Sequence, residues 1–459
     1  MCSTHVLFYI LVLTYVFGDT VCYPNSPNCQ EGYDKNNCHI LEINTDFHFS
    51  KECQEFVDHL DSVQINGEVK LNIDDGVVFT PNVVVKVGSS LEINTDLELI
   101  NDFVIEPSAY VKFMNLTLTG GKFSVLDETE ITGTLSIEKN SIVEVDKNVK
   151  ITVDEIHVKG NGQLLTAEEA SLNINKNFNM YENAFCLIGK AGRVFVSNQL
   201  QLYDASKLST EDEVSVTVSG YFWNVFQNAK VLLGKRGQSV SQNIYVYATA
   251  SVILEEENQL SLENLYLFQN ATLQVLDNSV VSCGQYFSTY SYTMISIGNN
   301  VTIKSSSMFI LFSTEVILGE NNRISADSFE VNSYSKMTVG NNSTFVVSGK
   351  RLSKECSKGE STDYCTAIAI KGAAELKVES NSNQPLFTVG IGKVVVWNTT
   401  QIVPLNAKCI NLFKFERKYI YKNEVEKKQY RLVCGETIGR YCETEFVDVI
   451  CDDKQKDEL

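Results

Sequence analysis

Short apolar pairs recur through the middle of this 459-residue chain at a spacing of 21 or 22 residues. Each pair has the pattern apolar–x–apolar, which places both side chains on one face of a strand. The clearest pairs are Val231/Leu233, Val252/Leu254, Leu273/Val275, Ile295/Ile297, Val316/Leu318 and Met337/Val339. Two further strand-like segments recur in the same phase, one at Leu260/Leu262 and one at Tyr266. Because one such unit cannot bury its apolar face alone, the repeat demands a stack of units.

The length and pattern of the unit select among stacked architectures. About 21 residues are too few for a four-stranded propeller blade, and no unit has a helical period. We therefore predict an all-β fold, a single-stranded parallel β-helix with three short strands per coil, over residues 62–405. At about 21 residues each this makes about sixteen coils. Coils of this size exceed those of the hexapeptide type, so we expect a right-handed solenoid.

Glycine follows the first strand of the unit in phase at Gly298, Gly319 and Gly340. Gly298-Asn299-Asn300 and its counterpart at Gly340 have the composition of tight turns. We expect a positive φ at these turns.

Cysteines gather at the two ends of the predicted solenoid, where caps are needed. We predict an N-terminal cap over residues 19–61 and a C-terminal cap over residues 406–455. A further pair brackets the loop 357–364. The cysteines that we expect in disulfides are Cys22, Cys29, Cys38, Cys53, Cys356, Cys365, Cys409, Cys434, Cys442 and Cys451. Their connectivity stays open, and we expect Cys186 and Cys283 to be buried and unpaired.

The two termini predict the compartment. Residues 6–17 form an apolar run too short to span a bilayer, and small residues precede Asp19, so residues 1–18 are typical of a cleaved signal peptide. We see no later segment apolar and long enough for a membrane span. The last residues, Lys456, Asp457, Glu458 and Leu459, match the signal recognised by the receptor that retrieves lumenal proteins to the endoplasmic reticulum. We therefore expect a soluble protein of that lumen, with secretion or the cell surface as the alternative.

Asn-X-Ser/Thr sequons are expected to carry glycans on the exterior of a protein in this compartment. They begin at Asn115, Asn270, Asn300, Asn341, Asn342 and Asn398. The sequons at Asn341 and Asn342 overlap, so we expect at most one of them to be used at a time.

The formal net charge of −19 makes nucleic acid an unsuitable partner, because an acidic surface repels phosphates. The densest acidic runs are Glu211-Asp212-Glu213 and Glu255-Glu256-Glu257. They are typical of solvated loops, and weak calcium binding is the alternative. Calcium takes six to eight oxygens from several segments, which neither run supplies alone.

Thiol, metal and cofactor chemistry finds little support. Disulfide oxidoreductases use Cys-x-x-Cys, which this chain lacks. Cys38, His39, His48, Cys53 and His59 are too widely spaced for a zinc site readable from sequence, and an oxidising lumen favours disulfides. No nucleotide-binding loop occurs, so we expect no cofactor.

Aromatic residues gather in four or five successive coils and form the best candidate binding surface. If Ile244 and Val246 point inward, the aromatics of the same strands point outward as a stripe suited to stacking on sugars or docking unfolded segments. The candidate stripe consists of Tyr245, Tyr247, Tyr266, Phe268, Tyr290 and Tyr292. If the register slips by one residue, the rings stack inside instead, and Phe329/Val331 favours the inner register for its own coil.

The central segment resembles the pectate-lyase-like parallel β-helix superfold. In composition and repeat style it is also similar to the Asn-, Ile- and Lys-rich β-helical ectodomains of surface receptors in parasitic amoebae. The resemblance implies a fold and a binding habit, and no inherited activity.

The superfold includes pectate lyases and polygalacturonases, so polysaccharide cleavage is an activity to be weighed. Polygalacturonases combine Asn-Thr-Asp and Asp-Asp with Gly-His-Gly and Arg-Ile-Lys motifs. This chain has the first two, at Asp46, Asp96 and Asp74-Asp75, and lacks the last two. Pectate lyases need an arginine beside a calcium cluster, and no arginine here flanks an acidic run.

Three function classes remain open. The first is a non-enzymatic binding or scaffold protein that holds glycoproteins or glycans on the side of the solenoid. The second is a carbohydrate-active enzyme of the β-helix type with unrecognised carboxylates, and the third is a low-affinity calcium-binding protein. For the first class we assign no catalytic, cofactor or metal residue.

Overall fold

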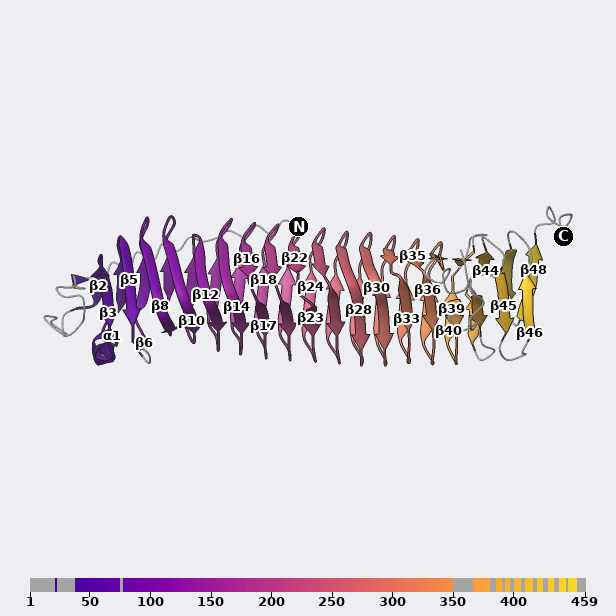
Figure 1. Ribbon diagram of the computed structural model, residues 1–459, viewed down its shortest axis with the longest axis horizontal. Coiled ribbons are helices and arrows are strands. Elements are labelled where there is room, and N and C mark those ends of the chain that lie inside the picture. Colours follow the sequence, from indigo (N-terminus) through magenta and orange to yellow (C-terminus); the bar gives the residue numbers. More distant parts are fainter. Residues whose placement is uncertain are drawn as a thin grey trace, which may run out of the picture.

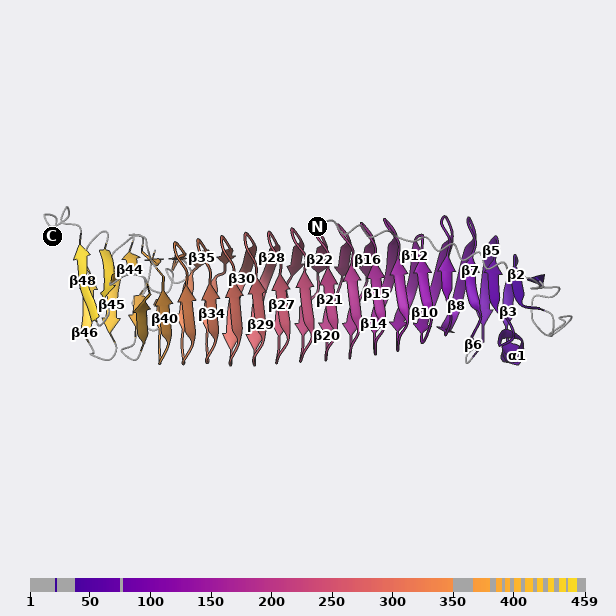
Figure 2. The same cartoon turned by 180° about the vertical axis from the view of Figure 1, so that it is seen from behind.

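The computed structural model is a long, straight rod in which the chain winds from one end to the other (Figures 1 and 2). It is an all-β parallel solenoid of about 15 turns with about 21 residues per turn, which confirms the predicted fold. The structure describes residues 21–22, 38–74, 77–349, 366–379, 385–389, 393–396, 400–405, 409–415, 419–423, 428–432, 437–442 and 445–451.

One side of the rod is a parallel sheet, sheet A, to which each coil contributes one strand. Among the described residues it has eighteen strands. They are β1 (Val21–Cys22), β2 (Ile40–Ile43), β4 (Ser62–Ile65), β7 (Asn82–Val85), β9 (Phe103–Ile105), β11 (Lys122–Val125), β13 (Ile142–Val145), β15 (Gln163–Thr166), β18 (Phe185–Ile188), β21 (Lys207–Thr210), β24 (Lys230–Leu233), β27 (Ser251–Leu254), β29 (Thr272–Val275), β31 (Met294–Ile297), β34 (Glu315–Leu318), β37 (Lys336–Val339), β40 (Glu375–Val378) and β43 (Gln401–Pro404).

The other side, sheet B, receives two strand segments from each coil, separated by a bend of about two residues. In six coils of the described part of the chain the bend is so slight that both segments form one long strand, as in β28 (Gln259–Phe268) and β30 (Val280–Tyr290). The remaining strands up to the C-terminal region are β3 (Phe47–Phe49), β5 (Glu68–Ile73), β6 (Val78–Phe79), β8 (Ser90–Leu99), β10 (Tyr110–Leu118), β12 (Thr129–Ile137), β14 (Lys150–Val158), β16 (Ser171–Ile174), β17 (Asn177–Met180), β19 (Arg193–Val196), β20 (Gln199–Leu202), β22 (Ser215–Val218), β23 (Phe222–Val225), β25 (Gln238–Ser241), β26 (Asn243–Val246), β32 (Thr302–Lys304), β33 (Ser307–Ile310), β35 (Arg323–Ala326), β36 (Ser328–Val331), β38 (Thr344–Val347), β39 (Thr366–Ile370), β41 (Phe387–Val389) and β42 (Lys393–Val396).

Strand alternation explains why the coils stack. In β27, for example, Val252 and Leu254 are buried while Ser251 and Ile253 are partly exposed. Val252 lies opposite Val231 in β24 and Leu273 in β29, so each buried side chain meets its equivalents in the neighbouring coils. The result is one continuous apolar core along the rod.

Left-handed backbone turns connect sheet A to sheet B in most coils. The turn residue with positive φ is Glu213, Arg236, Glu257, Asn278, Asn300, Asn321 and Asn342 in seven successive coils. The equivalent turns from sheet B back to sheet A include Asp204, Gln227 and Ala248. In the six turns from Glu213 to Asn321 the residue with positive φ donates its N–H to a carbonyl of the next coil, as from Asn300 to Glu320 at 2.9 Å.

The positive φ predicted for these turns is confirmed, and the glycines in them have a separate role. Positive φ belongs to Asn300, Asn321 and Asn342, and not to the glycine that precedes each by two residues. Glycine is needed there because a Cβ on Gly298 would lie 2.9 Å from the backbone nitrogen of Asp277, and one on Gly340 would lie 2.6 Å from the Gly319 carbonyl. Close approach between coils therefore selects glycine.

Two fully buried asparagines tie adjacent coils together from inside the turns. Asn322 Nδ2 donates to the carbonyls of Gly298 and Gly319, both at 2.9 Å, and its Oδ1 accepts from the Val301 N–H at 2.7 Å. Asn258 makes the equivalent bond to the Gly234 carbonyl. These bonds satisfy backbone groups that would otherwise be buried without partners.

The ends of the rod differ from its middle. Parallel pairing is already present before residue 62, since β1 pairs with β2 and β2 with β4. A 3-10 helix, η1 (Lys51–Cys53), and a short helix, α1 (Gln54–Val57), follow β3 at this end. At the other end pairing becomes antiparallel over β44 (Cys409–Phe415), β45 (Tyr419–Asn423), β46 (Lys428–Leu432), β47 (Thr437–Cys442) and β48 (Glu445–Cys451).

The cysteines are described in part. Cys22 and Cys38 form a disulfide, and Cys53 is disulfide-bonded as well. Cys186 and Cys283 are buried free thiols whose pKa is raised by burial. The backbone places Cys409 opposite Cys442, and Cys451 lies in β48. Cys29, Cys356, Cys365 and Cys434 lie outside the described residues.

Candidate binding face

A column of stacked aromatic rings runs along the outside of sheet B. Each ring comes one residue after the last buried position of the second strand segment, where the side chain turns outward. The six rings of this aromatic column belong to Tyr181, Tyr203, Phe226, Tyr247, Phe268 and Tyr290. Successive centroids are 4.8–5.2 Å apart and the ring planes differ by only 3–10°. Parallel strand spacing, about 4.8 Å, sets this period.

A second, shorter column widens the first into an aromatic block. Tyr245 stacks on Tyr266 with centroids 5.1 Å apart. Each also lies beside a ring of the aromatic column, Tyr245 at 6.1 Å from Tyr247 and Tyr266 at 6.1 Å from Phe268. These four residues make up the aromatic block, which lies on β26, the residue that follows it, and β28.

Stacking closes the faces of the inner rings. Carbon atoms in contact lie about 3.5–4.0 Å apart, so rings with centroids about 5 Å apart leave no space for a sugar between them. Phe268 is covered by Tyr247 on one face and by Tyr290 on the other. The edges and the tyrosine hydroxyls therefore form the part of the block that a partner can reach.

The hydroxyls of Tyr247 and Tyr266 in the block remain protonated at neutral pH. Burial, followed by the proximity of Tyr245, raises the pKa of both Tyr247 and Tyr266 above the usual value. The same cause, with Tyr181 as neighbour, raises the pKa of Tyr203. The rings thus present an uncharged face on a protein of net charge −19.

A polar border lines the block where sheet B bends. Asn264 Nδ2 donates to Asn243 Oδ1 at 2.7 Å, and Asn243 Nδ2 donates to the Tyr221 carbonyl at 2.7 Å. Asn264 Oδ1 in turn accepts from the Tyr286 N–H at 3.2 Å. This ladder holds the strands that carry the block in register.

Five of the six stripe residues come together as described, and the sixth does not. Ile244, Val246, Leu265 and Leu267 are buried, so the outward register holds for Tyr245, Tyr247, Tyr266, Phe268 and Tyr290. Tyr292 instead occupies a left-handed turn with φ 60° and is 69% exposed. The inner register holds at Phe329 and Val331, which are buried.

Sequence reasoning missed the first half of the aromatic column. Tyr181, Tyr203, Phe226 and Tyr247 are 22, 23 and 21 residues apart, because coils in this region are one or two residues longer. His157 stacks below Tyr181 at 6.4 Å and Phe312 above Tyr290 at 6.4 Å. A search that allowed coil length to vary would have revealed all six rings.

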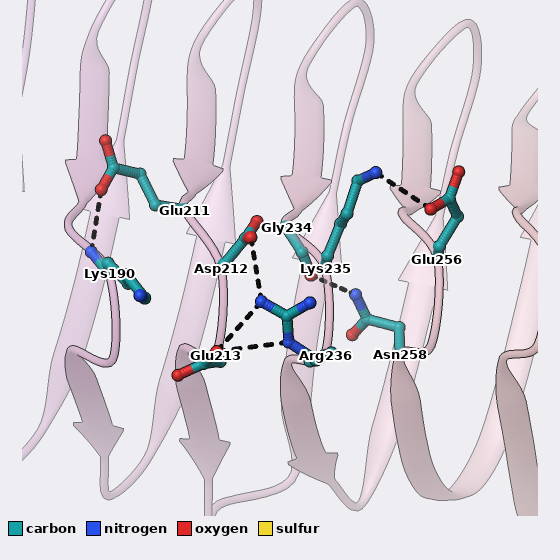
Figure 3. Close-up of polar contacts among 9 residues, drawn as sticks. All are labelled: Lys190, Glu211, Asp212, Glu213, Gly234, Lys235, Arg236, Glu256 and Asn258. Atoms are coloured by element: carbon teal, nitrogen blue, oxygen red, sulfur yellow. Dashed lines mark hydrogen bonds and ion pairs between the residues drawn. The ribbon is translucent and has the colours of Figure 1, made fainter. Parts of the chain in front are cut away.

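Two carboxylates of the first acidic run pair with Arg236 of the next coil, while Glu211 accepts a hydrogen bond from the Lys190 N–H of the preceding coil at 2.9 Å (Figure 3). Arg236 lies 3.3 Å from Asp212 Oδ2 and 3.0 Å from Glu213 Oε1. The prediction that no arginine flanks an acidic run holds along the sequence and is wrong in space. In the second run, Glu256 pairs with Lys235 at 2.9 Å.

Three of the aspartates considered for catalysis, Asp46, Asp74 and Asp96, have structural partners, and Asp75 lies outside the described residues. Asp46 Oδ1 accepts from the Lys70 N–H at 2.8 Å, Asp96 Oδ1 accepts from Asn115 Nδ2 at 2.7 Å, and Asp74 pairs with His48 at 2.9 Å. The His48 hydrogen bond holds the pKa of Asp74 below its usual value. Among the described residues no group of three or more His, Cys, Asp or Glu is placed to hold a metal ion.

The asparagines of the sequons differ in exposure and in the hydrogen bonds of their side chains. Asn115 is engaged twice, donating to Asp96 and accepting from the Thr134 N–H at 2.6 Å. Asn270 and Asn300 are exposed, and no hydrogen bond of their side chains is found in the described part. Asn342 Nδ2 donates to Asn321 Oδ1 at 3.2 Å, and the Oδ1 of Asn341 is buried. Asn398 lies outside the described residues, as do residues 1–18 and 456–459.

Comparisons with known proteins add no family to this description. Within the described ranges, no helix has the length and apolar character required to cross a membrane. No protein-family model, no curated protein and no solved structure matches the chain.

Proposed function

We propose that the chain is a lumenal glycoprotein of the endoplasmic reticulum that binds other glycoproteins without catalysis. The observation that carries the proposal is the aromatic block, an uncharged outward surface built on a rigid sheet. Exposed aromatic clusters on soluble proteins commonly mark interaction sites.

The closed ring faces favour a polypeptide over a bare glycan as the main ligand. Sugars pack on aromatic faces, and the inner faces of the block are occupied by neighbouring rings. Extended polypeptide segments can instead pack apolar side chains across ring edges and hydrogen-bond to the hydroxyls of Tyr245, Tyr247 and Tyr266. We therefore propose unfolded or extended segments of glycoproteins as the ligand.

The compartment and the second partner follow from the terminal sequences. The apolar leader within residues 1–18 and the tail Lys456–Asp457–Glu458–Leu459 support entry into the secretory pathway and return by a retrieval receptor. We propose that the resemblance in composition and repeat style to amoebic receptor ectodomains reflects a binding role. Under this proposal the chain has a binding role in the lumen, as those ectodomains have at the cell surface.

The test uses a permanently unfolded glycoprotein as the probe, before and after enzymatic removal of its glycans. The Tyr245→Ala, Tyr266→Ala double variant removes the second column of the block. Tyr203→Ala is the matched control, because Tyr203 also stacks on two rings but lies outside the block. We expect the double variant to lose probe binding and the control to retain it. Equal binding by all three proteins contradicts the proposed face.

The same assay separates the two kinds of ligand. Binding that persists after glycan removal supports recognition of the polypeptide. Binding that disappears with the glycans shows that sugar is the ligand and contradicts the preference for polypeptide.

A further inference from the structure

The sequon at Asn270 lies in a tight turn that turns its side chain into solvent. Gln269 and Asn270 have φ values of 52° and 64°, and the Ala271 N–H donates to the Phe268 carbonyl at 3.2 Å. Two consecutive positive φ values closed by this bond are the features of a type I′ turn. The Asn270 amide is exposed, and no hydrogen bond of this amide is found among the described residues.

The next coil places an exposed ring beside this amide. Phe268 lies opposite Tyr290 in the β28–β30 register, so Asn270 lies opposite Tyr292 two residues further on. The Asn270 N–H donates to the Ser291 carbonyl at 3.0 Å, which holds the two turns together. Tyr292 has φ 60°, close to the value at Asn270, so both side chains leave the backbone in the same direction, about 4.8 Å apart.

Tyr292 differs from the rings of the aromatic column because its faces are open. It is 69% exposed, and no contact of its ring with another aromatic ring is found in the described part of the chain. An open phenol ring exposes apolar surface to water, and covering that surface with another apolar group lowers the free energy.

N-linked glycosylation supplies such a surface. The first N-acetylglucosamine is joined to the asparagine Nδ2, and its ring carries a face of C–H groups that packs on the electron-rich face of an aromatic ring. We propose that Asn270 is glycosylated and that its first N-acetylglucosamine packs against the ring of Tyr292. This inference rests on the proposed entry into the secretory pathway.

Two matched positions exist within the same rod. Asn300 has the same Asn-X-Thr sequon, φ 56° and an exposed side chain, but the residue opposite in the next coil is Asn321, which offers no ring. Tyr334 has φ 64° and is also 69% exposed, but the residue opposite in the preceding coil is Ser313, which carries no sequon. Asn300 controls for glycosylation and Tyr334 controls for ring reactivity.

The test measures how fast tetranitromethane nitrates Tyr292 relative to Tyr334, with site-resolved peptide mass spectrometry. The full chain is expressed in a host that leaves high-mannose glycans, and these are trimmed to a single N-acetylglucosamine. We expect Tyr292 to react several-fold more slowly than Tyr334. In Asn270→Gln, which has no sugar at this position, we expect equal rates.

The outcomes separate this inference from the proposal beneath it. Equal nitration rates with Asn270 occupied overturn the sugar–ring contact. Occupancy at Asn300 without occupancy at Asn270 overturns the inference and leaves the secretory route standing. A chain with neither site occupied overturns both.

Discussion

Removing one ring from the middle of the aromatic column tests whether stacking stabilises the rod. Phe226 contacts Tyr203 at 4.9 Å and Tyr247 at 5.0 Å, and both ring planes lie within 10° of its own. An aromatic pair contributes about 0.5–1.5 kcal/mol beyond the area it buries. Phe226→Ala loses two pairs, so we expect a loss of about 1–3 kcal/mol from stacking, with a further loss from reduced burial.

A second substitution at the same position separates stacking from burial. Phe226→Leu keeps an apolar side chain over the sheet and loses only the ring contacts, so we expect it to retain the burial component. Tyr334→Ala is the control, since its ring is 69% exposed and has no ring contact among the described residues. Exposed positions of this kind change stability by about 0.5 kcal/mol or less.

The assay is native-state hydrogen exchange at the backbone amides of β23 and β26. Stability in a solenoid is a sum over coils and their interfaces, so the coils next to Phe226 should open more readily than distant ones. Chemical denaturation gives the global change. If Phe226→Ala and Tyr334→Ala affect these amides equally, the rings do not stabilise the rod by stacking and the reasoning is refuted.

Three further outcomes are expected. Asn322→Ala removes three buried hydrogen bonds and should lower the free energy of unfolding by about 1–3 kcal/mol or more. Asn321→Gly, at the exposed turn position with φ 57°, should change it little, because glycine also adopts a positive φ. Equal effects in urea denaturation would refute the structural role of the buried amide. Burial and the hydrogen bond to Glu130 raise the pKa of Tyr110 to about 12, so the stability that this group contributes is present below about pH 10 and is lost as pH rises through about 12. In Glu130→Gln, absorbance titration should show a lower pKa for Tyr110. An unchanged pKa would contradict the assigned cause. Glycopeptide analysis should find Asn115 unoccupied in the folded protein, because both ends of its amide are hydrogen-bonded to neighbouring coils, and a natively folded protein carrying sugar there would contradict this.

Most of the fold could be predicted from the repeat. Val252 and its equivalents recur at one coil length and lie on one face, which leaves a parallel stack as the only way to bury them. The roles of the turn glycines could not be predicted, because the clash at Gly298 involves Asp277 of the preceding coil. Spacing along one chain does not reveal which backbone atoms of two coils meet.

The candidate face could also be predicted only in part, because contacts between coils are not visible in the sequence. Alternation within one strand places Tyr245 and Tyr247 on the outside, but ring stacking depends on contacts between coils. Alternation alone also predicts Tyr292 in the stripe, but the turn between β30 and β31 interrupts that alternation. The pairing of Arg236 with Asp212 likewise joins residues 24 positions apart and is invisible in the sequence.

Site-directed photo-crosslinking in cells tests the binding role most directly. A photoreactive residue replaces Gln285, which is exposed and precedes Tyr286 beside the block, and in a second protein it replaces Lys336, which is exposed on sheet A. Both proteins keep the residues that precede and follow the rod. We predict adducts with lumenal glycoproteins from position 285 and few from position 336. Equal adducts from both positions, or none from 285, would contradict a binding face on sheet B.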